Sequence, residues 1–87
     1  MSQTHDTLKI IARAPFSVYY EGEAEAISAT NKVGRFDILP GHADFFSILK
    51  SDEVLIQPGG GKDPVSFTIN NGIMTVRDNE VLLFVDM

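Results

Sequence analysis

Residues that favour turns divide this chain into short apolar segments, which leaves little room for long helices. Such residues recur at intervals of about 8 to 12 positions, and they fall at Pro15, Glu21-Gly22, Asn31 to Gly34, Pro40-Gly41, Ser51-Asp52, Pro58 to Gly61, Asn70 to Gly72 and Asp78-Asn79. Between them, apolar and polar residues mostly alternate, which is the period of a half-buried strand. The pattern predicts an all-β fold, an antiparallel β-sandwich or flattened barrel of short strands.

The expected strands follow from this alternation and from the positions of the turns. Glu21-Gly22 and Asn31 to Gly34 are expected to turn the chain, and Asn70 to Gly72 is expected to form a tight hairpin. The predicted strands are Leu8 to Arg13, Phe16 to Tyr20, Glu23 to Thr30, Arg35 to Leu39, Glu53 to Gln57, Val65 to Ile69, Ile73 to Arg77 and Glu80 to Val85.

Two segments are less regular than the others. The stretch His42 to Lys50 fits a helical stripe as well as a buried strand, and its length does not decide between them. The stretch Val81 to Val85 is apolar at every position, which predicts a central strand buried on both faces.

Length and charge limit the classes of protein that this chain can represent. With 87 residues it forms one domain, predicted over residues 8–87 after a flexible polar leader, residues 1–7. It has no cysteine, and its net charge is −5 with no cluster of basic residues, which opposes nucleic-acid binding. No basic and apolar signal peptide and no run of about 18 apolar residues is present. We expect a soluble domain that does not insert directly into a membrane.

The residues suited to catalysis or metal binding are few. The two histidines are His5, in the polar leader, and His42, so a histidine pair at a metal would require the leader to fold back. His42, Asp44 and Ser47 are close in sequence, but a catalytic triad is defined by geometry. The alternating Glu21, Glu23 and Glu25 are expected on a solvated face. We expect no catalytic residue, no metal and no cofactor.

The glycine-rich segment Gly59 to Gly61, followed by Lys62, is the one candidate phosphate-binding loop. A P-loop requires a further glycine where this chain has Ile56, and a serine or threonine where it has Asp63. Pro64 also disfavours the helical start that such a loop needs. The segment is expected to be a flexible hairpin loop.

One stretch, Gly34 to Ala43, stands out because it places a strand between two glycine turns and ends in Pro-Gly-His-Ala. This stretch resembles the signature of the epsilon subunit of F-type ATP synthase, called delta in mitochondria, within its N-terminal β-sandwich domain. The segments Leu8 to Ala12, Glu21 to Ile27 and Phe67 to Val76 with Asn79 to Leu83 are similar to further parts of that domain, in the same order.

The resemblance implies a flattened sandwich of about ten strands in a non-catalytic rotor subunit of the central stalk. That subunit links gamma to the membrane c-ring and supports proton-coupled ATP synthesis. Carried to this chain, the resemblance implies a gamma-facing His42 and Ser47, and a strand in the His42 to Lys50 stretch. It also implies a c-ring-facing loop, namely Gly34, Arg35, Phe36, Asp37, Ile38, Leu39, Pro40 and Gly41.

The chain departs from the family pattern in several places. The family commonly has glycine, proline and glycine where this chain has Asp37, Asp44 and Asn71. The sequence stops at Asp86-Met87, before the C-terminal helical hairpin of the family, which is expected to be either naturally absent or removed. We expect a monomer when the chain is isolated, peripheral to an energy-transducing membrane at the cytoplasmic face of a bacterial inner membrane. The departures leave an alternative open, a stand-alone β-sandwich adaptor of the same fold with a different protein partner.

Overall fold

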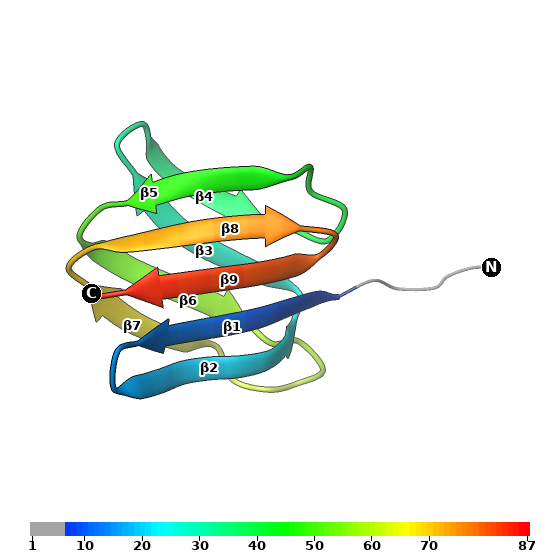
Figure 1. The fold of residues 1–87 in the computed structure, drawn as a ribbon. Helices are drawn as coiled ribbons and strands as arrows, with labels where there is room; N and C mark the ends of the chain where they lie inside the picture. The colour runs from blue at the N-terminus through cyan, green and yellow to red at the C-terminus, as the bar shows by residue number, and fades with distance from the viewer. Residues whose placement is uncertain (1–6) are drawn as a thin grey trace.

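Two packed β-sheets make up the fold in the computed structural model, which describes residues 7–87 (Figure 1). The resemblance implied about ten strands; nine are formed by the described residues, and the all-β sandwich is confirmed. The expected leader falls on residues 1–6, outside the described part, and on Thr7. The strands are β1 (Leu8–Ala14), β2 (Ser17–Ala24), β3 (Ala26–Asn31), β4 (Gly34–Ile38), β5 (Phe45–Leu49), β6 (Asp52–Gln57), β7 (Val65–Ile69), β8 (Gly72–Arg77) and β9 (Glu80–Val85).

The strands divide into a five-stranded sheet, in the order β2-β1-β9-β8-β5, and a four-stranded sheet, in the order β4-β3-β6-β7. The five-stranded sheet lies in front in Figure 1, with β9 at its centre. β1 and β9 pair in parallel, from Lys9↔Glu80 to Arg13↔Phe84, and the other pairs are antiparallel. The strand expected within His42 to Lys50 is confirmed as β5. Within residues 7–87, no helix has the length and apolar character needed to span a bilayer.

The core lies between the two sheets and is built from alternate residues of each strand. Leu8, Ile10 and Ala12 of β1 point inward, as the alternation predicted. In β9, Val81, Leu83 and Val85 are buried, whereas Leu82 and Phe84 are 38% and 41% exposed. The prediction that Val81 to Val85 is buried on both faces is therefore wrong. β9 is central in its sheet, but no element among the described residues covers the outer face of that sheet.

The tight hairpin occurs at a different turn from the one that the sequence favoured. Asp78 and Asn79, between β8 and β9, have φ angles of 51° and 64°, as a two-residue type I′ turn requires. The hairpin expected at Asn70 to Gly72 is not formed, because β7 pairs with β6 while β8 pairs with β5 and β9. That segment instead carries the chain from one sheet to the other. Local turn propensity does not decide which strands pair.

The turn predicted at Glu21-Gly22 is also absent. β2 continues through both residues, and its pairing with β1 extends from Ala14↔Ser17 to Leu8↔Ala24. The chain instead bends at Glu25, where it leaves the five-stranded sheet for β3. Continuous pairing with β1 from Leu8↔Ala24 to Ala12↔Tyr20 outweighs the preference of a single glycine for a turn.

Aromatic pairs close the two open sides of the sandwich. A bulge in β2, opposite Ala12 and Arg13 of β1, leaves Tyr19 without a paired residue. The Tyr19 ring stacks on Phe67 of β7 with centroids 4.6 Å apart. On the other side, Phe36 of β4 and Phe45 of β5 meet at 5.3 Å. Each pair spans the gap between the edges of the two sheets and keeps water from the core.

The buried and exposed apolar residues at the end of β4 allow a direct test of this core. Ile38 is fully buried, and the adjacent Leu39 is 55% exposed. We expect Ile38→Ala to lower the free energy of unfolding by about 2 to 4 kcal/mol, because it leaves a cavity. Leu39→Ala is expected to change it by about 0.5 kcal/mol or less. Urea denaturation measures both values, and equal losses would contradict the assigned burial.

Candidate functional site

The stretch expected to face the c-ring is mainly a strand, and it runs from one end of the sandwich to the other. Residues Gly34–Ile38 form β4, at an edge of the four-stranded sheet. Gly34 lies at the end of the sandwich that holds the Pro15-Phe16 and Lys32-Val33 turns, which we call the Phe16 end. Gly41 lies at the opposite end, which we call the hairpin end, where its N–H donates to the Oδ1 atom of Asn79 at 2.7 Å. The two glycines of this motif therefore cannot belong to one contact loop.

Side chains along β4 have three different environments. Ile38 is in the core, and Phe36 is half-buried against Phe45. Arg35 and Asp37 point away from the core, over the outer face of the four-stranded sheet. Asp37 accepts a hydrogen bond from the Ser28 hydroxyl, so its carboxylate lies on the sheet face and not at a loop tip. Ile38 stabilises the fold and is not a surface contact.

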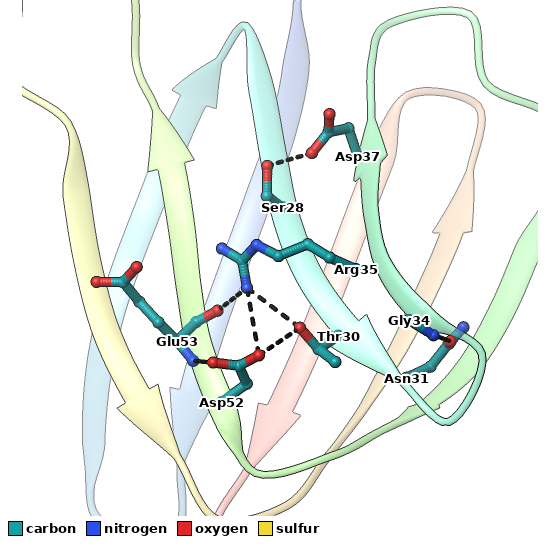
Figure 2. Close-up of polar contacts among 8 residues, drawn as sticks. All are labelled: Ser28, Thr30, Asn31, Gly34, Arg35, Asp37, Asp52 and Glu53. Atoms are coloured by element: carbon teal, nitrogen blue, oxygen red, sulfur yellow. Dashed lines mark hydrogen bonds and ion pairs between the residues drawn. The ribbon is translucent and has the colours of Figure 1, made fainter.

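Arg35 is held in a polar network on the same sheet face, which Figure 2 shows. Its Nη1 atom donates to the Glu53 carbonyl oxygen at 2.6 Å and to the Thr30 hydroxyl at 3.2 Å. The Asp52 carboxylate lies 3.9 Å from the same nitrogen. Since both charged side chains are well exposed, this ion pair contributes little to stability by itself. The network orients Arg35 along the sheet.

Asp52 is the one group among the described residues whose pKa is clearly shifted. The Thr30 hydroxyl donates to its Oδ2 atom at 2.8 Å, and the Glu53 N–H donates to its Oδ1 atom at 2.7 Å. These hydrogen bonds, the one from Thr30 first, hold the pKa of Asp52 below its usual value. The nearby Arg35 charge, the smallest of the causes, also lowers the pKa, so the network favours the ionised form of Asp52.

His42 and Ser47, the two residues expected to face gamma, have unlike surroundings. His42 is exposed at the hairpin end, where its Nδ1 atom lies 2.8 Å from the Ala43 carbonyl oxygen and its ring edge meets Phe45. Ser47 is only 7% exposed, and its hydroxyl accepts a hydrogen bond from Asn31 at 3.1 Å. The side chains that β5 presents outward are Phe46 and Ile48, which are 63% and 68% exposed.

The outer face of the five-stranded sheet carries a continuous group of apolar side chains. In register across the sheet, Ile11 lies beside Leu82, and Phe84 beside Ile73, which in turn lies beside Ile48. We call this surface the outer apolar face; it consists of Ile11, Phe46, Ile48, Ile73, Leu82 and Phe84. Charged residues lie beside it on the same face, and they are Lys9, Arg13, Glu21, Glu23, Arg77 and Glu80. An exposed apolar surface with a charged margin is typical of a protein-binding site.

Sequence analysis missed this surface because an all-apolar strand was interpreted as buried on both sides. A signal was nevertheless present in the first strand, where Lys9 and Arg13 alternate with buried residues. Because β1 and β9 pair in register, the face that carries Lys9 and Arg13 also carries Leu82 and Phe84. That face must reach solvent. The pairing of β1 with β9 is not visible in either segment alone.

The remaining polar residues do not assemble into a reactive centre in the described structure. Within residues 7–87, no three His, Cys, Asp or Glu side chains lie together as a metal site would require. Glu21, Glu23 and Glu25 line an open cavity at the hairpin end, together with Lys62 and Asp63. The sandwich thus has one polar outer sheet face and one apolar outer sheet face, a combination typical of a domain that docks on another protein.

Comparison with known proteins agrees with this class. The family described as ATP synthase, Delta/Epsilon chain, beta-sandwich domain matches residues 7–87, and the chain belongs to this family. The ATP synthase epsilon chain of Clostridium kluyveri is 32% identical over 82 residues, which cover 94% of this chain and 61% of that protein. The epsilon chain of Trichlorobacter lovleyi is 30% identical over 81 residues and is covered to 57%. The chain thus spans about 60% of the length of these relatives.

Solved structures show the same fold. A chain in the structure of Euglena gracilis mitochondrial ATP synthase, described as OSCP/F1/c-ring, superposes with a TM-score of 0.85 at 17% identity. The match covers 99% of this chain and 54% of the other. A chain in the Tetrahymena thermophila mitochondrial ATP synthase central stalk and c-ring superposes with a TM-score of 0.77 at 16% identity. The recognised family and the β-sandwich are therefore confirmed.

The lowered pKa of Asp52 predicts a pH-dependent effect of Thr30→Val. The unfolded pKa of aspartate is about 3.9, so the hydrogen bond from Thr30 stabilises the fold above about pH 4. That stability is lost as the pH falls through the lowered folded-state pKa. We expect Thr30→Val to be less stable than the wild type at pH 7 and to approach it near pH 2 in urea denaturation. Thr68→Val, on the same sheet face, is the control, and a Thr30→Val deficit that is constant with pH would contradict the assignment.

Proposed function

We propose that this chain is a non-catalytic domain of the central stalk, or rotor, of an F-type ATP synthase. It links gamma to the c-ring and so supports proton-coupled ATP synthesis. Membership of the delta/epsilon family carries the proposal, and the exposed outer apolar face supports it. The relatives named epsilon chain are bacterial, which supports a position peripheral to the cytoplasmic face of an energy-transducing inner membrane.

The outer apolar face is the surface proposed to bind gamma. It lies on the central and edge strands of one sheet, where backbone pairing holds the apolar side chains in fixed positions. Burial of such side chains by a partner is favourable by about 25 cal/mol for each Å² removed from water. His42 lies at the hairpin end with its ring against Phe45, on the side of β5 that faces β4, and we propose that it contacts gamma beside this surface. Ser47 is proposed to support the gamma contact indirectly, because its hydrogen bond with Asn31 holds β5 in place against β3.

The c-ring is proposed to contact the Phe16 end. Two turn tips there expose apolar side chains, since Phe16 is fully exposed and Val33 is 92% exposed. Gly34 and Arg35 lie beside them. Pro40 and Gly41, which were grouped with these residues in the sequence, lie at the hairpin end. The proposed ring contact therefore uses only the first part of the Gly34 to Gly41 stretch.

The two proposed surfaces suit a domain that transmits torque. The outer apolar face lies on the flat side of the five-stranded sheet, and the Phe16 end lies where its strands terminate. Gamma on the outer apolar face and the c-ring on the Pro15-Phe16 turn can therefore bind at the same time. Strand pairing and a shared core connect both surfaces, so a force on one is carried to the other.

Substitution on the outer apolar face tests the gamma contact. We expect the double variant Leu82→Thr with Phe84→Thr to bind gamma at least about tenfold more weakly, because it removes two exposed apolar side chains at the centre of the face. Threonine suits a strand, so the melting temperature should stay close to that of the wild type. Ser66→Ala, on the outer face of the other sheet, is the control. Unchanged binding of gamma by the double variant would refute this surface.

Substitution at the two ends tests which of them meets the c-ring. We expect Phe16→Ser to reduce binding to isolated c-rings by about tenfold or more and to leave gamma binding unchanged, because Phe16 lies outside the cleft beside β5. The matched control is Leu39→Ser, which removes an exposed apolar side chain at the opposite end. Surface plasmon resonance with immobilised c-rings measures both. Loss of ring binding in Leu39→Ser alone would place the contact at the hairpin end.

A further inference from the structure

The edge strand β5 offers unpaired backbone groups beside an apolar cleft. We propose that an extended segment of gamma adds to the five-stranded sheet as a further strand along β5. This segment carries apolar residues at alternate positions and an acidic residue near Lys32 and Lys50. The inference rests on the proposed function for the identity of the partner.

Strand pairing determines which backbone groups of β5 face outward. In a two-residue hairpin, the residues that flank the turn form a hydrogen-bonded pair, so Arg77 and Glu80 exchange their bonds. Alternation along β8 then directs the backbone groups of Met74 toward β5, where they pair with Ser47. The N–H and C=O groups of Phe46 and Ile48 must point away from β8, toward the free edge.

Two contacts at the end of β5 agree with this orientation. The Lys50 N–H, which has the same direction as that of Ile48 in an extended chain, donates to the Thr30 carbonyl at 2.9 Å and not to β8. The Ile48 carbonyl accepts a hydrogen bond from the neighbouring Ser47 hydroxyl at 3.3 Å. Both groups therefore point away from β8. The Lys50 N–H is already bonded to β3, so the part of the edge left for an added strand is Phe46 to Ile48.

A cleft of about 520 Å³ lies along this edge, between β5 and the Lys32-Val33 turn. Phe46, Ile48 and Val33 line it, and all three are well exposed. A strand laid in the cleft would place alternate side chains beside Phe46 and Ile48 on the outer apolar face, and the others against Val33. The new strand would thus extend the surface proposed to bind gamma.

The positive charge at the cleft favours an acidic residue in the added segment. Lys32 and Lys50 both line the cleft, and among residues 7–87 no carboxylate lines it. These are two of the seven basic residues in a chain with a net charge of −5. An acidic residue of the partner would be attracted here and repelled by most of the remaining surface.

The free edges of β2 and β4 are protected against strand addition, whereas that of β5 is not. The fourth edge strand, β7, also lacks charged residues, but Tyr19 of β2 stacks on its Phe67. β2 carries a bulge together with Glu21 and Glu23, and β4 carries Arg35 and Asp37. Charges and bulges are the usual means by which edge strands avoid pairing with other chains. β5, with the sequence Phe-Phe-Ser-Ile-Leu, has neither. An apolar edge strand without such protection is therefore expected to be covered by a partner in the assembled complex.

Amide hydrogen exchange in the 87-residue chain, free and bound to gamma from the same organism, tests the proposal. In the free chain, the amides of Phe46 and Ile48 should exchange rapidly, and those of Ser47 and Leu49 slowly. In the complex, we expect the Phe46 and Ile48 amides to slow by at least about tenfold. Unchanged exchange of these two amides in a formed complex would overturn strand addition and leave the proposed function intact.

Variants separate backbone pairing from side-chain contact. Ile48→Pro removes an N–H that faces the edge, which an edge strand tolerates, and we expect it to weaken gamma binding about tenfold more than Ile48→Thr does. Lys32→Glu with Lys50→Glu should also weaken binding, whereas Lys62→Glu, in the loop at the other end, should not. Equal effects of the proline and threonine variants would overturn strand addition. Failure of the wild type to bind gamma would overturn the proposed function as well.

Amide exchange of the chain without gamma is measured at several concentrations. If protection of the Phe46 and Ile48 amides rises with concentration, the occupant is a second copy of the chain, and the assignment to gamma is overturned.

Discussion

Parallel pairing of β1 with β9 is the interaction on which the rest of the structure depends. It joins the first and last strands, more than 60 residues apart, at the centre of the five-stranded sheet. Through β1 it attaches β2, and through β9 it attaches β8 and β5. The Lys9 N–H reinforces the start of the pair by donating to the Asn79 carbonyl at 2.8 Å. Without this pair the strands on either side would have no common sheet, and the core residues Ile10 and Leu83 would lose their shared environment.

The same pairing explains why the two sheets differ on their outer faces. The four-stranded sheet turns Ser28, Thr30 and Arg35 outward, and these residues bond to one another and to neighbouring groups. The five-stranded sheet turns Leu82 and Phe84 outward, and they have no such partners. The polar groups of the four-stranded sheet face are therefore hydrogen-bonded to one another and to water, whereas a partner that covers the apolar side chains of the five-stranded sheet face lowers their free energy. This asymmetry makes the domain suited to docking on one side.

Much of the fold could be predicted from particular residues. Alternation in Leu8 to Arg13 and in Val65 to Ile69 predicted β1 and β7, and Asn31 to Gly34 predicted the turn before β4. The hairpin at Asn70 to Gly72 was wrong, because turn propensity does not reveal whether the next strand stays in the same sheet. For the candidate site, the Gly34 to Ala43 motif predicted the family. It did not predict that Gly34 and Gly41 lie at opposite ends, or that Ile38 is core.

The sequence by itself determined the strand class, most turns and the family, since each depends on local periodicity or on a motif contiguous in the chain. Tertiary structure alone decided which strands are neighbours and which of their faces remain open. The apolar run Val81 to Val85 illustrates the difference, because its residues would suit burial on either side. Only the position of β9 in a sheet with one face uncovered decides that Leu82 and Phe84 reach solvent, and pairing partners distant in sequence determine that position.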